Sequence, residues 1–195
     1  FHADWERRVF ALTLATGMLG KWNIDESRHA RERQDPLTYI ENSYYENWLE
    51  GLETLLLDKG LLESDELAGK AITPDTGLLV KVPDPELASK ILASVASSER
   101  EAHSEALFRV GDRVVVRASE GTGHTRAPRY VQGVSGIVSA VVGCHSFPDS
   151  NATGVHEGAT LYRVSFQGED LWGQTGANSE VLVDLWEPYL NAGES

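Results

Sequence analysis

The first third of the chain has the spacing of apolar positions that is typical of amphipathic helices. A first helix is predicted where four apolar residues fit one helical face: Trp5, Val9, Leu12 and Leu19. Gly20 follows them and supplies an end for this helix. A second helix is predicted to begin near Asp25, whose carboxylate suits a helix N-terminus, and to end before Pro36.

The best-marked helix is predicted over residues 44–59. Ser43 precedes it, and Glu46 follows three residues later, which is the spacing of a capping box. The apolar stripe of this helix consists of Leu49, Leu52, Leu55 and Leu56. Gly60 stands where a left-handed C-cap belongs, and residues 64–66 are expected to open a further short turn.

After Leu107 the period of the apolar positions changes to two, which predicts β-strands. The runs are VVVR at 114–117, IVSAVV at 137–142, LYRVSF at 161–166 and VLVDLW at 181–186. Four or five short strands predict a small barrel, and the pattern F-x-V-G-D-x-V-x-V that starts at Phe108 resembles the opening of an SH3-like barrel. The glycine turn at 121–123 is predicted to be a hairpin loop.

These patterns predict an α+β protein with a helical N-terminal half that wraps a partner, followed by an SH3-like small β-barrel. The expected parts are a helical region over 1–67 and a barrel domain over 106–195. Between them, the polar and proline-containing segment 68–105 is expected to be a linker or extended region that could contain a short helix.

Composition and charge exclude several classes of protein. With 195 residues, 17 basic against 30 acidic side chains and a net charge of −13, the chain would be repelled by nucleic acid and by anionic membranes. It contains no apolar run long enough for a membrane span. A lone Cys144 argues against a secreted disulfide scaffold, so the cytoplasm is the expected location. The start at Phe1 instead of Met suggests that a natural N-terminal segment precedes this sequence.

A search for catalytic motifs in this chain alone finds no site. The sequence contains no P-loop, no G-x-S-x-G elbow and no G-x-G-x-x-G, and its six histidines include no pair at the i, i+4 spacing of a zincin. Cys144 and His145 are adjacent, so on a strand they would point to opposite faces and could not share one ion. We therefore expect no metal site in this chain.

Two clusters near the second and third helices have two interpretations. The basic cluster consists of Arg28, Arg31 and Arg33, and the aromatic cluster consists of Tyr39, Tyr44, Tyr45 and Trp48. If 44–59 is helical, Tyr44 and Trp48 share a face, and Tyr45 lies on the adjoining one. The aromatic side chains are then either ordinary half-buried packing, with Tyr45 in the core, or the wall of a pocket or interface.

Over nearly its whole length the chain resembles the β subunit of nitrile hydratase. In the helical half the resemblance lies in FHADWE (1–6), IDESR (24–28), DPLTYIENSYYENW (35–48) and DKGLL (58–62). In the β half it lies in FRVGDRVVVR (108–117), GHTRAPRYVQG (123–133), FPD (147–149), LYRVSF (161–166), EDLWG (169–173) and VDLWEPYL (183–190). The order and spacing of these blocks, more than any single one, carry the resemblance.

The resemblance implies a division of labour between two chains. In that family an α subunit holds cobalt(III) or iron(III) in a cluster of oxidised cysteines, and the β subunit forms the other wall of the active site. The partner implied is therefore a nitrile hydratase α subunit, in an αβ heterodimer or (αβ)2 heterotetramer that hydrates a small nitrile to an amide. The tryptophan at position 48 favours cobalt over iron.

The resemblance also implies roles for particular residues. Arg28 of IDESR matches an arginine that binds the oxidised cysteine oxygens, a task for which a planar guanidinium suits better than lysine. The other matched positions form the substrate pocket: Ile24, Ser27, Tyr44, Tyr45 and Trp48.

One position departs from the family pattern. A second arginine is expected in an RYVRG-like motif, but here the motif reads RYVQG and Gln132 takes that place. Glutamine could preserve hydrogen bonds while losing the charge. Arg126 and Arg129 are near in sequence, but if this segment is a strand, Arg129 and Gln132 face opposite sides.

Three other functions are compatible with parts of the sequence. A thiocyanate-hydrolase-like subunit is one alternative, although in that enzyme the two halves found here are usually separate chains. A metal-delivery activator would resemble the helical half alone, and a free SH3-like binding module would leave the helical resemblance unexplained.

Overall fold

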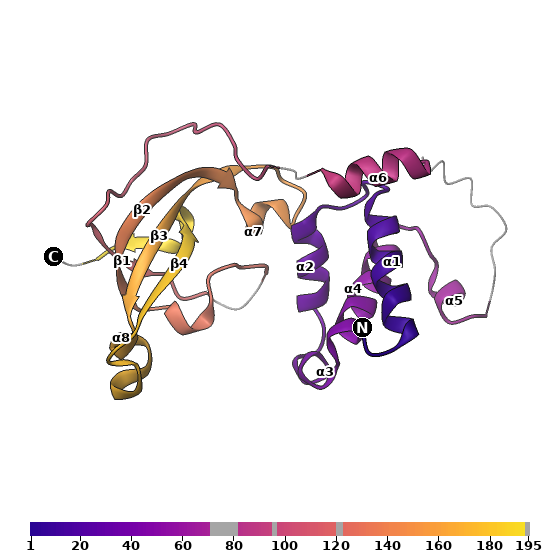
Figure 1. Ribbon diagram of the computed structural model, residues 1–195, viewed down its shortest axis with the longest axis horizontal. Helices are drawn as coiled ribbons and strands as arrows, with labels where there is room; N and C mark the ends of the chain where they lie inside the picture. Colours follow the sequence, from indigo (N-terminus) through magenta and orange to yellow (C-terminus); the bar gives the residue numbers. More distant parts are fainter. Residues whose placement is uncertain (71–81, 95–96, 120–122, 194–195) are drawn as a thin grey trace. The chain divides into compact units, whose positions relative to one another are not determined.

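The computed structural model describes residues 1–70, 82–94, 97–119 and 123–193 (Figure 1). The chain divides into two compact units. A helical unit contains residues 1–96 together with 152–154, and a β unit contains residues 97–151 and 155–195. The α+β class predicted from the sequence is therefore confirmed.

The helical unit is built around one central helix. Its helices are α1 (Asp4–Gly17), α2 (Ile24–Glu32), α3 (Pro36–Glu41), α4 (Tyr44–Asp58), α5 (Ser64–Leu67) and α6 (Pro85–Ala93). Both α1 and α2 pack against α4, so α4 lies between them (Figure 1). The buried apolar side chains of this unit are Val9, Ala30, Leu52 and Leu55. Helix α6 falls in the region that the sequence predicted as linker, of which residues 71–81 and 95–96 lie outside the described residues.

The predicted helix over 44–59 is confirmed, with α4 ending one residue earlier, at Asp58. The Ser43 and Glu46 capping box forms, and the Ser43 N–H donates to Glu46 Oε2 at 2.7 Å. Gly60 adopts φ +62°, which is the left-handed conformation expected after a helix. The capping signal and the glycine therefore marked both ends of this helix correctly.

The first predicted helix is also present, but its predicted apolar face is only partly buried. Val9 is buried, whereas Trp5 and Leu12 are 40% and 53% exposed. Helix α1 ends at Gly17, and Gly20 follows in the left-handed region at φ +65°. Periodicity identified the helix, but it could not tell which apolar side chains are covered within this chain.

The β unit is a five-stranded antiparallel sheet in the order β4-β3-β2-β1-β5. Its strands are β1 (Arg113–Val116), β2 (Ser135–Ser146), β3 (Gly158–Gln167), β4 (Glu180–Trp186) and β5 (Leu190–Ala192). Long β2 pairs with β3 through two register shifts, between Val138 and Ala140 and between Val141 and Gly143. Such shifts bend a strand and strengthen its twist.

The core of the β unit follows the alternation expected for strands with one buried face. Tyr162, Val164 and Phe166 on β3 are fully buried, as are Val138 on β2 and Leu185 on β4. Short helices connect and flank the strands: η1 (Arg129–Val131), α7 (Pro148–Asn151), α8 (Gly168–Trp172), η2 (Gly173–Gly176) and η3 (Glu187–Tyr189).

Two hydrogen-bonded tyrosines tie loops to the β core. The Tyr162 hydroxyl donates to Glu187 Oε2 and accepts the Phe108 N–H at 3.2 Å. The Tyr189 hydroxyl donates to Asp149 and accepts the Arg126 N–H at 3.0 Å. Each phenol therefore fixes a segment that the sheet itself does not hold.

Two expectations about the segment before β2 have different outcomes. The hairpin loop predicted at 121–123 lies largely outside the described residues, because residues 120–122 are not among them. The strand considered for the RYVQG motif is wrong, since residues 129–131 form the 3-10 helix η1. No helix in the described residues is long and apolar enough to cross a membrane.

Candidate functional site

Helix α2 carries the residues for which the sequence predicted a site, and a strong cap fixes its start. Asn23 Oδ1 accepts the N–H groups of Asp25 and Glu26 at 2.9 and 3.0 Å. The Glu26 carboxylate in turn accepts the Asn23 N–H at 2.7 Å, which completes a capping box. Lys59, just after α4, pairs with Glu26 at 2.6 Å and links the two helices. The first turn of α2 is therefore held from both sides.

Arg28 is positioned by a carboxylate within its own helix. Its Nη1 donates to Asp25 Oδ1 at 2.9 Å, and the Asp25 side chain is only 6% exposed, whereas that of Arg28 is 41% exposed. Because this contact engages one terminal nitrogen, the rest of the guanidinium keeps N–H donors for another acceptor. Asp25 thus orients a cation that still has donors to offer.

An aromatic cluster joins the start of α4 to α1. The ring centroids of Tyr44 and Trp48 are 5.6 Å apart, and Tyr45 lies 5.2 Å from Tyr44 and 5.9 Å from Trp48. Phe10 of α1 approaches Trp48 at 6.1 Å, and Phe1 stacks on Tyr45 at 5.2 Å. Tyr45 is half-buried, and its contacts are with these rings at the edge of the unit. The interpretation of Tyr45 as a core residue is therefore wrong.

A pocket of about 370 Å³ opens in the helical unit beside this cluster. Residues from the four helices α1, α2, α4 and α6 and from the loop before α2 line it: Thr13, Leu14, Gly17, Met18, Trp22, Asn23, Ile24, Ser27, Arg31, Trp48, Ile91 and Leu92. Most of this surface is apolar, and the volume suits a small organic molecule. Three of the predicted pocket residues, Ile24, Ser27 and Trp48, meet here.

Tyr44 and Tyr45 are not among the pocket's lining residues, although both contact Trp48, which is. Tyr44 is 66% exposed. These two phenols therefore contact Trp48 without lining the pocket, and they can position its indole.

The residue that the sequence prediction passed over is Arg31. Its guanidinium carbon lies 4.6 Å from the Trp48 ring centroid, and its Nε donates to the Ser27 carbonyl at 3.1 Å. Burial lowers the pKa of Arg31, and the neighbouring charge of Arg28 acts in the same direction. The signal was present, since Ile24, Ser27 and Arg31 have the i, i+3, i+7 spacing of one helical face.

Gln132 lies in the β unit, where its side chain closes a loop. Its Oε1 accepts the Ser119 N–H and its Nε2 donates to the Ala127 carbonyl, both at 3.0 Å. The Gln132 amide, which the sequence prediction expected to preserve hydrogen bonds of the family's arginine, thus makes two hydrogen bonds within this chain.

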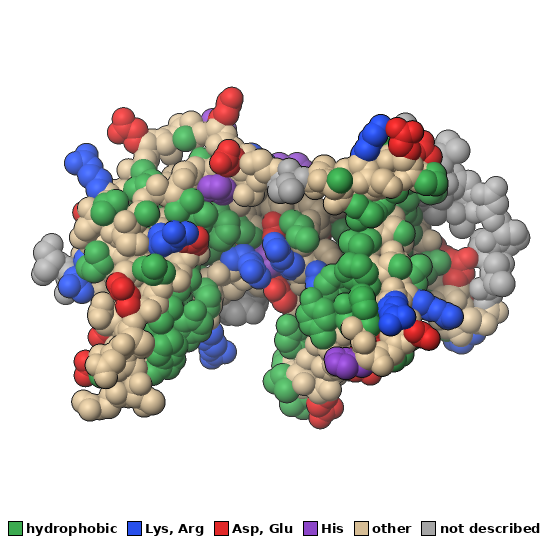
Figure 2. Space-filling model, in the orientation of Figure 1, with side chains coloured by type: hydrophobic (Ala, Val, Ile, Leu, Met, Phe, Trp, Pro, Cys, Tyr) green, Lys and Arg blue, Asp and Glu red, His purple; other side chains and the backbone are tan. Residues whose placement is uncertain are grey.

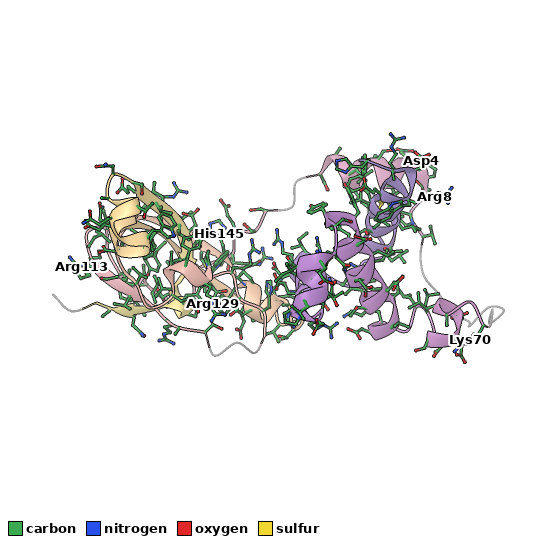
Figure 3. The ribbon with its side chains drawn as sticks, turned by 90° about the horizontal axis from the view of Figure 1, so that it is seen from below. Asp4, Arg8, Lys70, Arg113, Arg129 and His145 are labelled. Carbon is green, nitrogen blue, oxygen red and sulfur yellow. The ribbon has the colours of Figure 1, made fainter. Side chains whose placement is uncertain are left out.

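Arg129 and Gln132 line the same hollow of the β unit, together with Ala118, Ser119, Gly123, Thr125 and Ala127. Arg129 is labelled in Figure 3. The expectation that the two side chains face opposite sides is wrong, because it assumed a strand. In a 3-10 helix, residues i and i+3 lie nearly in line, so Arg129 comes to the same side as Gln132. The neutral glutamine thus has a cationic neighbour.

The fold and the site together define a class: an α+β protein whose helical unit bears a small apolar pocket edged by arginine and aromatic side chains. Two family models match the chain end to end. Residues 1–96 match the N-terminal domain of the nitrile hydratase β subunit, and residues 97–192 match its C-terminal domain.

Curated proteins give the same result. The chain is 38% identical to the low-molecular weight cobalt-containing nitrile hydratase subunit beta of Rhodococcus rhodochrous, over 97% of this chain and 88% of that protein. It is 38% identical to the nitrile hydratase subunit beta of Pseudomonas putida, with the same coverage. The cobalt-containing subunit of Pseudonocardia thermophila is 33% identical over 97% of this chain and 85% of that protein. The chain belongs to the family of nitrile hydratase β subunits, which are components of a heteromeric hydro-lyase.

Among solved structures, a recombinant apo-enzyme of thiocyanate hydrolase from Thiobacillus thioparus aligns with a TM-score of 0.45 and 24% identity. The alignment covers 68% of this chain and 98% of that one.

Proposed function

We propose that this chain pairs with an α subunit to form a nitrile hydratase that converts a nitrile and water into an amide. The observation that carries the proposal is a pocket lined by Ile24, Ser27 and Trp48 in a chain whose two halves both match the β subunit. Arg28 is not a lining residue, but it lies on helix α2, which also carries Ile24 and Ser27. The metal belongs to the partner in this proposal. Cobalt is the metal we propose, since two of the similar proteins are named as cobalt-containing.

The residues present fit a role beside an oxidised-cysteine metal centre. Such a centre presents oxyanions, and Arg28 has the matching chemistry: a half-exposed guanidinium, oriented by Asp25 through one nitrogen, with donors still free. When bound, the metal supplies Lewis-acid activation of water or nitrile. Arg28 contributes charge-assisted hydrogen bonds that hold the cysteine oxygens in place.

The predicted pocket residues of this chain shape the substrate-binding space and keep bulk water out of it. Ile24 and Trp48 offer apolar surface to the carbon skeleton of the nitrile, and Ser27 is a small residue that leaves room between them. Tyr44 and Tyr45 hold the indole of Trp48 through ring contacts at 5.6 and 5.9 Å. An apolar wall excludes water other than the reacting molecule.

Gln132, which stands where the family pattern has a second arginine, has a different role in this proposal. Gln132 holds the 118–127 loop through its amide, and Arg129 on the same side supplies the positive charge that glutamine lacks. The pair would share the task that one arginine performs elsewhere in the family.

The exposed apolar side chains of the helical unit support a partner-wrapping role. Ile24, Leu37, Ile40 and Tyr44 are each at least 60% exposed, and hydrophobic side chains cover much of this unit's surface in Figure 2. Exposed apolar surface of this extent is typical of a subunit interface. We further propose an αβ heterodimer or (αβ)2 heterotetramer in the cytoplasm, with the β unit as an SH3-like barrel and residues 68–105 linking 1–67 to 106–195.

Co-expression with a nitrile hydratase α subunit tests the proposal. The purified complex is analysed for cobalt and iron and then incubated with a small nitrile, and amide formation is followed. We expect a stable complex with about one metal ion per αβ pair and accumulation of amide. A chain that purifies alone and without metal would refute the proposal. A metal-loaded complex that consumes thiocyanate and leaves nitriles intact would assign the chain to thiocyanate hydrolysis instead.

A further inference from the structure

Arg31 is a half-buried cation without an ion pair in the part of the chain that the structure describes. The two arginines nearest to it in sequence do have carboxylate partners: Arg28 on α2 pairs with Asp25, and Arg33, the residue after α2, pairs with Asp58. Arg31 instead lies among apolar side chains and over the face of Trp48. Of the described residues that line the pocket, it alone carries a charge.

The hydrogen bonds of Arg31 leave one edge of its guanidinium free. Nε donates to the Ser27 carbonyl at 3.1 Å, and Nη2 donates to Ser27 Oγ at 3.3 Å. Together these two nitrogens form the side edge of the planar group, so Ser27 occupies that edge. The end edge, formed by Nη1 and the second hydrogen of Nη2, has no acceptor among the described residues. A fork of two parallel N–H groups is the geometry that binds a carboxylate with two hydrogen bonds.

The Arg31 side chain is also held rigidly. Ser27 anchors one edge, the indole of Trp48 lies against its face, and the close approach of Gly51 confines its Cγ. Rigidity matters for selectivity, because a fixed guanidinium loses little rotamer entropy when it binds an anion.

We propose that Arg31 determines substrate specificity by binding the carboxylate of nitriles that bear an acidic group at the end remote from the C≡N. This inference rests on the proposed function. The apolar walls would contact the carbon skeleton, and the guanidinium would hold the far end of the molecule. The pocket volume of about 370 Å³ accommodates a substituted aromatic ring or a short chain.

The competing explanation is that Arg31 only braces Trp48. A brace would influence every nitrile alike, whereas a carboxylate-binding group would influence acidic nitriles more. The two explanations therefore differ in the ratio of kcat/KM for an acidic nitrile and a neutral nitrile of the same shape.

The first measurement compares 4-cyanobenzoate with 4-cyanobenzamide as substrates of the complex of this chain with its α subunit. We expect Arg31→Gln to lower the ratio of kcat/KM, acid over amide, by about tenfold to a hundredfold, which is the range for hydrogen bonds to a charged group. The loss should appear as a higher KM for 4-cyanobenzoate. Arg31→Lys should recover part of the ratio, because it keeps the charge without the fork. Arg33→Gln is the matched control, since it removes a cation at the end of the same helix and outside this pocket.

The second measurement does not depend on turnover. Calorimetric titration of the same complexes with benzoate and with benzamide should show that Arg31→Gln weakens benzoate binding by a similar factor and leaves benzamide binding nearly unchanged. If 4-cyanobenzamide is hydrated and neither the ratio nor benzoate affinity responds to Arg31→Gln, this inference is wrong while the proposed function stands. If neither nitrile is hydrated but benzoate binding depends on Arg31, the proposed function is wrong and the anion site stands.

Discussion

Helices α2 and α4 meet at Gly51, and this contact sets the position of Arg31. A Cβ at position 51 would lie 2.4 Å from Arg31 Cγ, 3.2 Å from its backbone nitrogen and 3.3 Å from its Cα. Ordinary carbon contacts begin near about 3.5 Å, so Gly51→Ala requires a movement of about 1 Å. Because backbone atoms of α2 are involved and the Arg31 side chain is held by Ser27 and Trp48, rotation of one flexible side chain cannot relieve the clash.

The free-energy change of Gly51→Ala combines two opposing effects. Alanine in a helix interior gains about 1 kcal/mol over glycine, and overpacking costs about 1–3 kcal/mol. We expect a net destabilisation of up to about 2 kcal/mol. In a chain of this length each kcal/mol lowers the unfolding midpoint by about 2–4 °C. Arg31 would also shift relative to Trp48, so the ratio of kcat/KM for 4-cyanobenzoate and 4-cyanobenzamide should fall.

Thermal unfolding of the complex, followed by circular dichroism, measures this effect. Gly17→Ala is the control, because a Cβ at position 17 would meet no atom within 4 Å. This control should be neutral or slightly stabilising. Gly51→Ala could instead raise the unfolding midpoint, as alanine does at a helical position with open space around it, and leave the ratio of kcat/KM for 4-cyanobenzoate and 4-cyanobenzamide unchanged. In that case the contact between α2 and α4 does not position Arg31.

Three further predictions concern other parts of the chain. Asn23→Ala removes the acceptor that caps α2 and should destabilise the complex by about 1 kcal/mol, measured as a lower unfolding midpoint; an unchanged midpoint would show that the cap is dispensable. Gln132→Arg should be tolerated, because the hydrogen bond lost from the Ser119 N–H is at an exposed position where water can replace it. Assembly should be unchanged, and so should the metal content measured by elemental analysis. Loss of metal would show that this loop depends on glutamine. Burial and the Glu187 carboxylate raise the pKa of Tyr162 to about 12, so the stabilisation linked to this phenol is complete below pH about 10 and is lost as the pH rises towards 12. Urea unfolding at about pH 9 and about pH 11 should show a smaller pH dependence in Tyr162→Phe; equal pH dependence in the two proteins would contradict the assigned shift.

Local signals of the sequence predicted the elements well. The Ser43 and Glu46 pair and Gly60 marked the ends of α4, and the alternation of Tyr162, Val164 and Phe166 identified the buried face of β3. These features depend on neighbours in the sequence, so the pattern contains the information.

The errors came from features that depend on other parts of the structure. Periodicity grouped Trp5 and Leu12 with Val9, but among the residues that the structure describes, Val9 is buried and the other two are exposed. The comparison of Arg129 with Gln132 assumed a strand before Gln132, yet residues 129–131 form a 3-10 helix. Short apolar segments are ambiguous in this way, and tertiary context decides between the alternatives.

The candidate site was partly accessible to sequence reasoning. Ile24, Ser27 and Trp48 line one pocket and Tyr44 and Tyr45 do not, while the role of these residues in substrate binding stays a prediction. Arg31 was noticed only as one of three arginines, because a linear sequence does not show that Arg28 and Arg33 have carboxylate partners. The unpaired edge of its guanidinium becomes visible only when the side-chain contacts are known.

The central claim is that the helical unit of this chain provides Arg28 to a metal centre held by the α subunit. The most direct test is the rate of amide formation by the purified complex of Arg28→Ala, compared with the unsubstituted complex at equal metal content and equal assembly. We predict a loss of about tenfold to a hundredfold, as expected for a residue that supports metal ligands, and no such loss in Arg33→Gln. Amide formation at an unchanged rate in Arg28→Ala would contradict the account.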